Sequence, residues 1–362
     1  MRVHVKELQE GCILTEDVFS LTNRPIVPKN TILTYELIQF LQAFLVKDVK
    51  VSKTLVSGQL FIPENFVEEE EEKTEQKQED AELTFSDLFL QAANLYRKEF
   101  QSWQAGMTVD VAKVRAIIVP LLHELEKAPL EILTLHHLST EKEYLYQHSI
   151  AVGLISWFIG KKLNYKKGDL IQLALAGCLS DCGMAKVPES VLNKKGTLTS
   201  NEYNEIKNHP THSYNLIKNS TLIRDVGKVA VFQHHERLDG TGYPIGDKVH
   251  KIHPFALIIA VADTFHAMTS ARLYRKKQSP FKVMEMILQD NFGKFDISVI
   301  KALQSGIINF SIGTKVKLSN GTIAEILFFE EKSPTRPLIK LLETEEIISL
   351  EKNREIFIEE VL

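Results

Sequence analysis

A pair of adjacent histidines followed by a glycine-rich loop is the feature that most constrains what this chain can fold into. The stretch begins at His234 and ends at Gly246, and it reads HHERLDGTGYPIG. Residues 222–233 before it have the apolar spacing of a helix, so the two imidazoles close a helical segment. Three glycines in the loop permit backbone angles that are closed to other residues, and Pro244 fixes one φ angle. Because such a loop is costly in conformational entropy, it indicates a segment that holds a ligand rather than a simple connection.

A lone His-His pair also has a plainer interpretation, which is a surface turn after a helix that ends in cationic histidine. The remainder of the chain argues against it, because further candidate ligands lie on or beside strongly apolar helical segments. An uncompensated charge is costly in such surroundings, and contact with a metal ion would explain its presence there. These further candidates are His148, Asp181, His209 and Asp263.

The order of these residues resembles the pattern of the HD-GYP family, a branch of the HD metal-dependent phosphohydrolases. The residues that carry the resemblance are, in chain order, His148, Ser180-Asp181, His209, His234-His235, Gly242-Tyr243-Pro244 and Asp263. The resemblance covers residues 140–305 and includes connecting segments such as 195–199 and 267–275. It implies an all-helical domain that hydrolyses cyclic di-GMP, a bacterial second messenger, at a site of two or three divalent metal ions.

The resemblance also implies roles for individual residues. One metal ion would be held by His148, Ser180, Asp181 and Asp263, and the other by His209, His234, His235 and Asp181. Asp181 would bridge the two ions, and iron or manganese is the expected metal. Asp181 and Tyr243 are the expected catalytic residues. The expected substrate contacts are Gly242, Tyr243, Pro244, Arg272 and Arg275, of which the two guanidinium groups suit phosphate.

Two departures from the family pattern predict a damaged site. Ser180 stands where the family has histidine, and a neutral hydroxyl is a poor substitute for imidazole as a metal ligand. We therefore expect one intact metal site and one weakened or empty site. Met184 stands where the family has lysine, which removes an ammonium near the phosphate. Losing one such donor typically costs about 10²- to 10³-fold in rate, so slow or absent turnover is expected.

Three further positions near the motif bear on the number and kind of metal ligands. His266 stands where the family usually has aspartate, one helical turn after Asp263; it either supplies the missing imidazole or, as we favour, is an ordinary core or surface histidine. Cys182 is either a replacement ligand or a buried thiol, and we favour the thiol. Family members with three metals have a glutamate where this chain has Tyr144, with Glu143 one place away, so a third metal is not expected.

Composition excludes several classes of protein. The 362 residues include 43 basic and 47 acidic residues, and the net charge of −4 argues against a general binder of DNA or of membrane surfaces. Three cysteines form neither a zinc-type pair nor a disulfide framework, which favours a reducing cytoplasm. The chain starts without a signal-peptide pattern and has no apolar run long enough for a membrane span.

The hydrophobic periodicity divides the chain into five units and predicts a mainly α fold. A small α+β module (1–66) and an acidic flexible linker (67–82) come first, then a helical lead-in (83–139), the metal-binding helical domain (140–305) and a small β-rich tail (306–362). An Asn320-Gly321 pair between alternating segments predicts a hairpin in the tail. Within the helical domain, helices are predicted over 169–182, 280–289 and 297–307, and a capping box of Thr199 and Glu202 begins another helix that runs toward His209. The apolar faces of the lead-in helices favour core packing over any cofactor role, and they also offer a face for a homodimer. The first module offers a surface for a protein partner.

Two functions remain open at the level of sequence. One is a metal-dependent phosphodiesterase that cleaves cyclic di-GMP slowly to the linear dinucleotide or GMP. The other is a receptor or signalling scaffold that binds cyclic di-GMP without hydrolysis. Ser180 and Met184 favour the second, whereas the complete ligand set of the second metal favours the first.

Overall fold

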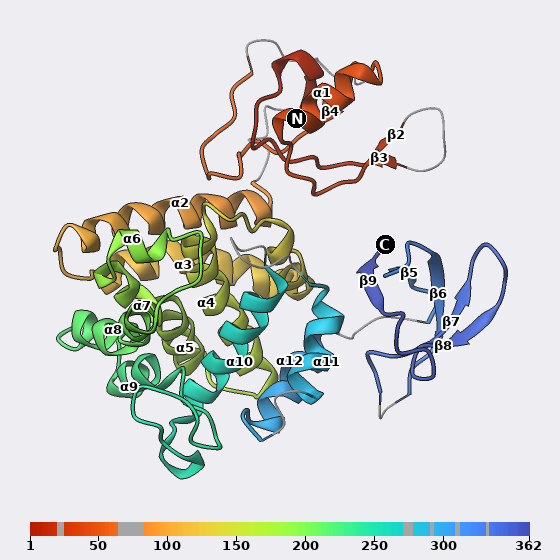
Figure 1. Cartoon of the computed structure of the whole chain (residues 1–362). Helices are drawn as coiled ribbons and strands as arrows, with labels where there is room; N and C mark the ends of the chain where they lie inside the picture. The colour runs from red at the N-terminus through yellow and green to blue at the C-terminus, as the bar shows by residue number, and fades with distance from the viewer. Residues whose placement is uncertain (20–24, 64–82, 271–277, 290–292, 308–311, 331–332) are drawn as a thin grey trace.

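The fold is mainly helical, with strands at both ends of the chain (Figure 1). The structure, a computed structural model, describes residues 1–19, 25–63, 83–270, 278–289, 293–307, 312–330 and 333–362. The helices are α1 (Tyr35–Ala43), α2 (Phe85–Gln104), α3 (Val111–Lys127), α4 (Tyr144–Lys162), α5 (Lys167–Leu179), α6 (Glu189–Leu192), α7 (Ser200–Lys207), α8 (His209–Ile217), α9 (Asp225–Gln233), α10 (Pro254–Thr269), α11 (Pro280–Gln289) and α12 (Ile297–Ile307). The strands are β1 (Arg2–His4), β2 (Val18–Phe19), β3 (Pro25–Val27), β4 (Asp48–Lys50), β5 (Lys315–Leu318), β6 (Ile323–Phe328), β7 (Leu338–Leu341), β8 (Ile347–Ser349) and β9 (Ile358–Val361).

The N-terminal unit mixes one helix with short strands, as its sequence predicted. β1 pairs with β4 and β2 with β3, both antiparallel. Thr34 caps α1 by accepting a hydrogen bond from the backbone N–H of Leu37. This unit has its own cluster of buried apolar side chains, separate from that of the helical domain. The predicted linker, 67–82, lies outside the described residues.

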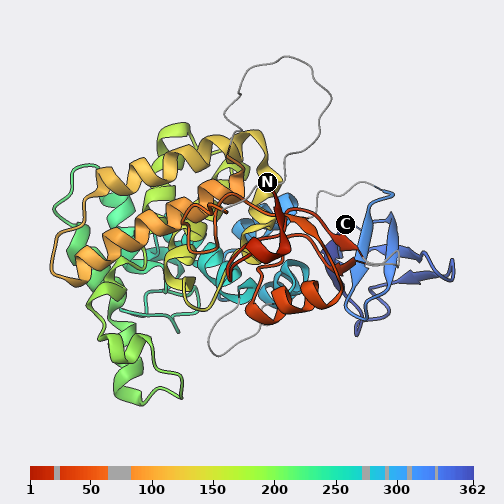
Figure 2. The same ribbon diagram turned by 90° about the horizontal axis from the view of Figure 1, so that it is seen from above.

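The lead-in helices pack into the helical core, which confirms the interpretation that we favoured. Figure 2 shows α2 and α3 side by side, and α2 also contacts α4. Tyr96 and Trp103 of α2 are fully buried, and the Tyr96 hydroxyl donates to the backbone oxygen of Cys178 at 2.8 Å. The residue limits of the five units and the homodimer stay predictions.

The central pair of helices, α4 and α5, approaches closely because glycines face each other across it. A Cβ on Gly177 would lie 3.0 Å from the Cα of Gly153, and a Cβ on Gly153 would lie 2.8 Å from the backbone oxygen of Ala174. Most of α4 is buried on all sides, which is typical of the central helix of a bundle. The close approach fixes the start of α4 relative to the end of α5, where His148 and Asp181 lie.

The C-terminal unit is a five-stranded antiparallel sheet in the order β8-β7-β6-β5-β9. The predicted hairpin joins β5 to β6, and Gly321 takes the left-handed conformation there with φ of +84°. Arg336 connects this unit to α11 of the helical domain, because its Nε and Nη2 donate to the two carboxylate oxygens of Glu285 at 2.6 and 2.7 Å. Both side chains are buried.

No helix among the described residues is long and apolar enough to cross a membrane.

Candidate metal centre

The turn after α5 brings Asp181 to the first residue of α8. The sequence predicted a helix over 169–182, but α5 ends at Leu179, and Asp181 stands between it and a short 3-10 helix, Cys182–Lys186. A Cβ on Gly183 would lie 2.2 Å from the backbone oxygen of His209, so only glycine allows this approach of the two backbones. The helix predicted from Thr199 toward His209 is α7, which ends at Lys207, and α8 begins at His209.

Two histidines present the same ring nitrogen to Asp181. His209 Nδ1 donates to the backbone oxygen of Ile206, and His234 Nδ1 donates to that of Val231, both at 2.7 Å. A neutral imidazole carries one N–H, so each Nε2 is left with a lone pair. A hydrogen bond from the second ring nitrogen to a backbone carbonyl is the usual way in which proteins orient a metal-binding histidine.

The resulting lone pairs converge on one carboxylate oxygen. Asp181 Oδ1 lies 3.1 Å from His209 Nε2 and 3.5 Å from His234 Nε2, and the two Nε2 atoms are 3.2 Å apart. Asp181 is 7% exposed, and its Oδ1 is buried without a hydrogen-bond partner among the described residues. Such an arrangement is repulsive unless positive charge lies between the atoms. With His235 these residues form a cluster that can hold a metal ion, and their donor atoms fit one.

A second cluster shares Asp181 and consists of His148, Asp181 and Asp263. His148 Nε2 lies 3.0 Å from Asp263 Oδ1 and 3.5 Å from Asp181 Oδ2. The hydroxyl of Ser180, the expected fourth ligand of this ion, donates to the backbone oxygen of Gly177 at 2.8 Å. Apart from the serine, six metal ligands were predicted, and the structure brings all six together. They form a group of four and a group of three, and Asp181 belongs to both groups.

The glycine-rich loop is held in place by a buried carboxylate that the sequence pattern did not identify. Glu236 is 2% exposed and accepts hydrogen bonds from the backbone N–H groups of Ile245, Gly246 and Asp247 at 2.8 to 3.2 Å. Glu236 could have been identified from its position in the sequence. It directly follows the two histidines and precedes a loop whose backbone N–H groups need an acceptor. Gly242 is required by packing, because a Cβ there would lie 2.4 to 2.5 Å from backbone atoms of residues 235–237.

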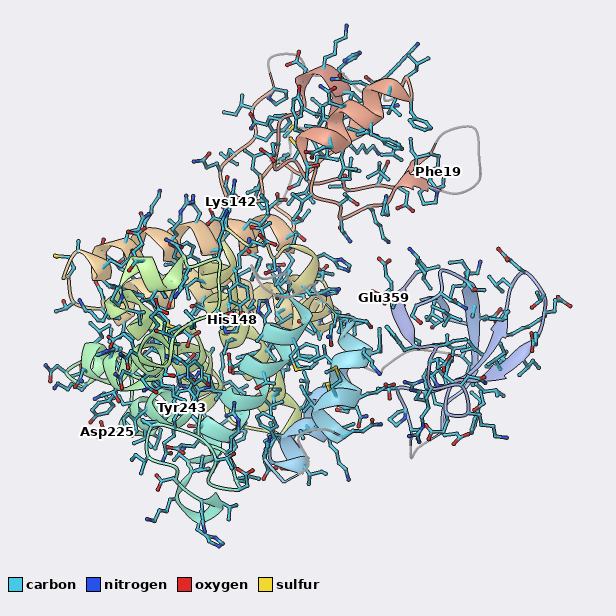
Figure 3. All side chains as sticks on the ribbon, in the orientation of Figure 1. Phe19, Lys142, His148, Asp225, Tyr243 and Glu359 are labelled. Atoms are coloured by element: carbon cyan, nitrogen blue, oxygen red, sulfur yellow. The ribbon has the colours of Figure 1, made fainter. Side chains whose placement is uncertain are left out.

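Tyr243 lies against the metal clusters through His235. The two rings are stacked, with centroids 4.6 Å apart and planes 29° apart, and the Tyr243 N–H donates to the backbone oxygen of His235 at 3.1 Å. Figure 3 labels Tyr243 and His148, which both lie within the helical part of the molecule. The loop thus places one phenol beside the candidate ligands.

Comparison with known proteins identifies the domain. Residues 133–299 match the family model described as "HD domain". The chain thus contains a domain that is similar to the HD domain. Cyclic di-GMP phosphodiesterase PA4108 of Pseudomonas aeruginosa is 29% identical over 242 residues, which are 67% of this chain and 58% of that protein. Cyclic di-GMP phosphodiesterase PdeB of Borreliella burgdorferi is 31% identical over 54% of this chain and 51% of that protein.

Further relatives support the same assignment. The 3'3'-cGAMP-specific phosphodiesterase 1 of Vibrio cholerae is 32% identical over 48% of this chain and 40% of that protein. The chain thus spans about half the length of these curated relatives. Among solved structures, the HDG"Y"P protein Bd1817 from Bdellovibrio bacteriovorus has a TM-score of 0.51 at 12% identity, covering 84% of this chain and 98% of that one. This last likeness concerns the fold alone.

The surroundings of the candidate ligands keep them in the ionisation states that a metal ion needs. Burial tends to raise the pKa of Asp181 and Asp263, but N–H groups and positive charge on the neighbouring imidazoles, which a bound metal ion would replace, outweigh it and hold both pKa values below the ordinary range. Burial, reinforced by His234, lowers the pKa of His235, so this ring is neutral at pH 7. Carboxylates and neutral imidazoles are the forms that coordinate cations.

His266, which stands where the family usually has aspartate, contacts His148 on the side of its ring that faces away from the other candidate ligands. His266 Nδ1 lies 2.9 Å from Nδ1 of His148, and the side chain is 1% exposed. Because it meets the ring nitrogen that faces away from Asp263, it orients His148 rather than adding a ligand. This agrees with our preference for a core histidine.

The acidic residue and the thiol near the motif both have structural rather than ligand roles. Glu143, the neighbour of the expected third-metal position, forms an ion pair with Arg97 at 2.9 Å, and Tyr144 stacks on His148 with ring centroids 5.0 Å apart. Cys182 is fully buried, and burial raises the pKa of its thiol to about 12, so it is a core thiol. The predicted substrate-binding Arg272 and Arg275 lie outside the described residues.

Proposed function

We propose that the protein is a metal-dependent phosphodiesterase that hydrolyses cyclic di-GMP to the linear dinucleotide or GMP, and that it does so slowly. The observation that carries the proposal is the pair of ligand clusters that share the buried carboxylate of Asp181. Bound divalent ions would neutralise the phosphoryl oxygens and make water a nucleophile at neutral pH. The similarity to relatives named as cyclic di-GMP phosphodiesterases supports the substrate.

The two clusters differ in the strength with which they would hold an ion. His209, His234, His235 and Asp181 offer three imidazoles and a carboxylate, a set that suits iron or manganese. His148, Asp181 and Asp263 offer one imidazole and two carboxylates, and the Ser180 hydroxyl, whose proton is donated to Gly177, adds only a neutral oxygen. We therefore infer one tight site and one weakened or empty site, with Asp181 bridging.

The phenol of Tyr243 would act as a hydrogen-bond donor. Burial, reinforced by Asp263, raises its pKa above the ordinary range, so the hydroxyl keeps its proton at neutral pH. Its ring also shields one face of His235 from water by stacking on it. Gly242 and Pro244 would set the loop against the substrate, and Arg272 and Arg275 would bind phosphate.

Slow turnover follows from the neighbourhood of Met184. This thioether, which cannot replace an ammonium, borders a cavity of about 330 Å³ that Tyr144, Leu145 and Ile206 also line. A phosphate approaching from this side would meet no cation from position 184, which removes one source of transition-state stabilisation.

The experiment is a turnover assay with protein loaded with Mn²⁺ or Fe²⁺ and offered cyclic di-GMP or 3'3'-cGAMP. We expect multiple turnovers of cyclic di-GMP, a large gain on combining Ser180→His with Met184→Lys, and none with Asp181→Asn. Binding without any product in the wild type and in the double variant would contradict the proposal. That result would support the second candidate, a receptor or scaffold, which the orientation of Ser180 and the identity of Met184 favour.

Three accompanying expectations belong to this proposal. A cytoplasmic location is supported by the three cysteines, which are all buried and unpaired. A homodimer and a protein partner of the N-terminal unit would be detected by the mass of the protein in solution and by co-purification.

A further inference from the structure

A row of hydrogen-bonding side chains leads away from the metal centre behind His148. Nε2 of His148 faces Asp263 Oδ1 at 3.0 Å, and its Nδ1 lies 2.9 Å from Nδ1 of His266. The hydroxyl of Ser270 lies 3.3 Å from both ring nitrogens of His266. His148, His266 and Ser270 are 2%, 1% and 0% exposed, so these groups exchange hydrogen bonds with one another rather than with water.

The contact between the two Nδ1 atoms requires one ring to donate and the other to accept. A neutral imidazole has one N–H and one lone pair, and either nitrogen can carry the proton. Without a metal ion, the carboxylates of Asp263 and Asp181 favour a proton on Nε2 of His148, because they lie 3.0 and 3.5 Å from it. Nδ1 of a neutral His148 then accepts, and Nδ1 of His266 donates.

Both roles reverse when Nε2 of His148 serves as a metal ligand. The lone pair of Nε2 is then in use, so His148 carries its proton on Nδ1 and needs an acceptor for it. His266 becomes that acceptor when its own proton lies on Nε2, from which it donates to Ser270 Oγ. The Ser270 hydroxyl both donates and accepts, so it fits either state, whereas a carboxylate at position 266 would only accept.

Tyr144 holds both imidazoles in the orientation that this exchange needs. Its ring centroid lies 5.0 Å from that of His148 and 6.4 Å from that of His266, with the planes 21° and 28° apart. The start of α4 is itself anchored, because Glu143 forms an ion pair with Arg97 of α2 at 2.9 Å. A ring stacked on both imidazoles restricts their rotation, so the two Nδ1 atoms stay facing each other.

We propose that His266, with Ser270 behind it and Tyr144 beside it, is a positioning residue that keeps His148 hydrogen-bonded both with and without a metal ion. This inference rests on the proposed metal centre and concerns the weaker site, that of His148, Asp181 and Asp263. A neutral acceptor holds the Nδ1–H of His148 less strongly than a carboxylate would. The low affinity of the weaker site therefore has a second cause in addition to Ser180.

The test is a series of variants at His266 that separates the donor role from the acceptor role. Asparagine both donates and accepts, aspartate only accepts, and phenylalanine does neither. His123→Asp on the exposed side of α3 is the matched control. The melting temperature of each EDTA-treated protein is measured, and the protein is then titrated with Mn²⁺.

We expect His266→Asp to tighten the weaker Mn²⁺ site by about 10-fold, because the carboxylate fixes the proton of His148 on Nδ1. His266→Phe should weaken that site by about 10-fold or more and lower the melting temperature of the EDTA-treated protein by about 2 to 10 °C, since Nδ1 of His148 loses its partner. His266→Asn should keep that temperature closer to wild type. The tight site in all three variants, and both sites in the control, should change by less than about 2-fold.

The outcomes separate this inference from the proposed function. If the wild type binds one tight ion and His266→Asp neither adds nor tightens a second, this inference alone is overturned. A loss of melting temperature in His266→Asn as large as that in His266→Phe would also overturn it, because His266 would then serve packing only. This second comparison decides the question if the aspartate variant does not fold. If the wild type binds no Mn²⁺ at all, both proposals fail.

Discussion

Replacing Glu236 with glutamine should loosen the Gly-Tyr-Pro loop. The carboxylate accepts from three backbone N–H groups, and Asp247 donates to Oε2 alone, at 2.9 Å. In Glu236→Gln one of the two oxygens becomes an NH₂ group, which cannot accept. One charge-assisted hydrogen bond is lost, and the N–H of either Ile245 or Asp247 is left without its acceptor, which together cost roughly 2 to 4 kcal/mol of local stability.

Amide hydrogen exchange is the measurement that resolves this effect. A local loss of that size accelerates exchange at Ile245, Gly246 and Asp247 by about 30- to 700-fold, because each 1.4 kcal/mol is a factor of ten. Glu236→Asp, which keeps the charge on a shorter side chain, should lie between glutamine and wild type. Glu345→Gln, at a side chain that is 79% exposed, is the control and should change nothing.

Exchange rates in Glu236→Gln that stay within about 3-fold of wild type at these three amides would refute this account of the loop. A uniform acceleration over α4 and α5 would refute it as well, because the variant would then have destabilised the whole domain. A selective effect should be accompanied by weaker substrate binding, since Tyr243 lies on the same loop.

Three further predictions concern the metal ligands, the loop and a helix start. In a Mn²⁺ titration of EDTA-treated protein, His209→Gln should abolish the tight site and His148→Gln should spare it; equal losses would contradict the assignment of two unequal sites. Gly242→Ala should lower the free energy of unfolding by about 1 to 3 kcal/mol, because its methyl group would meet backbone atoms at 2.4 to 2.5 Å, whereas Gly196→Ala, which meets nothing within 4 Å, should not. Hydrogen bonds from Lys194 and Thr199 lower the pKa of Glu202 from its ordinary 4.5 to about 2, so its stabilisation is complete above pH 4.5 and disappears as the pH falls to about 2. The urea midpoints of wild type and Glu202→Gln should therefore differ at pH 6 and converge near pH 2, and a constant difference would contradict the pKa shift.

Local patterns in the sequence were sufficient for much of the secondary structure. The helices over 280–289 and 297–307 and the hairpin at Asn320-Gly321 have the predicted places, because amphipathic spacing and turn residues act over a few positions. The same holds for the start of α7, where Thr199 and Glu202 form the expected capping box. The helix end at Leu179 was missed, because the predicted helix continued to Cys182.

The identity of the candidate ligands was fixed by the sequence, because imidazole and carboxylate groups on apolar segments indicate a metal whatever the fold. Only the tertiary structure decided how these groups are divided between two clusters and that Asp181 belongs to both. It also decided that the Ser180 hydroxyl turns to Gly177, and that His266 meets His148. Each of these depends on contacts between helices distant along the chain, and the backbone approaches at Gly153, Gly177 and Gly183 that create them have no local pattern in the sequence.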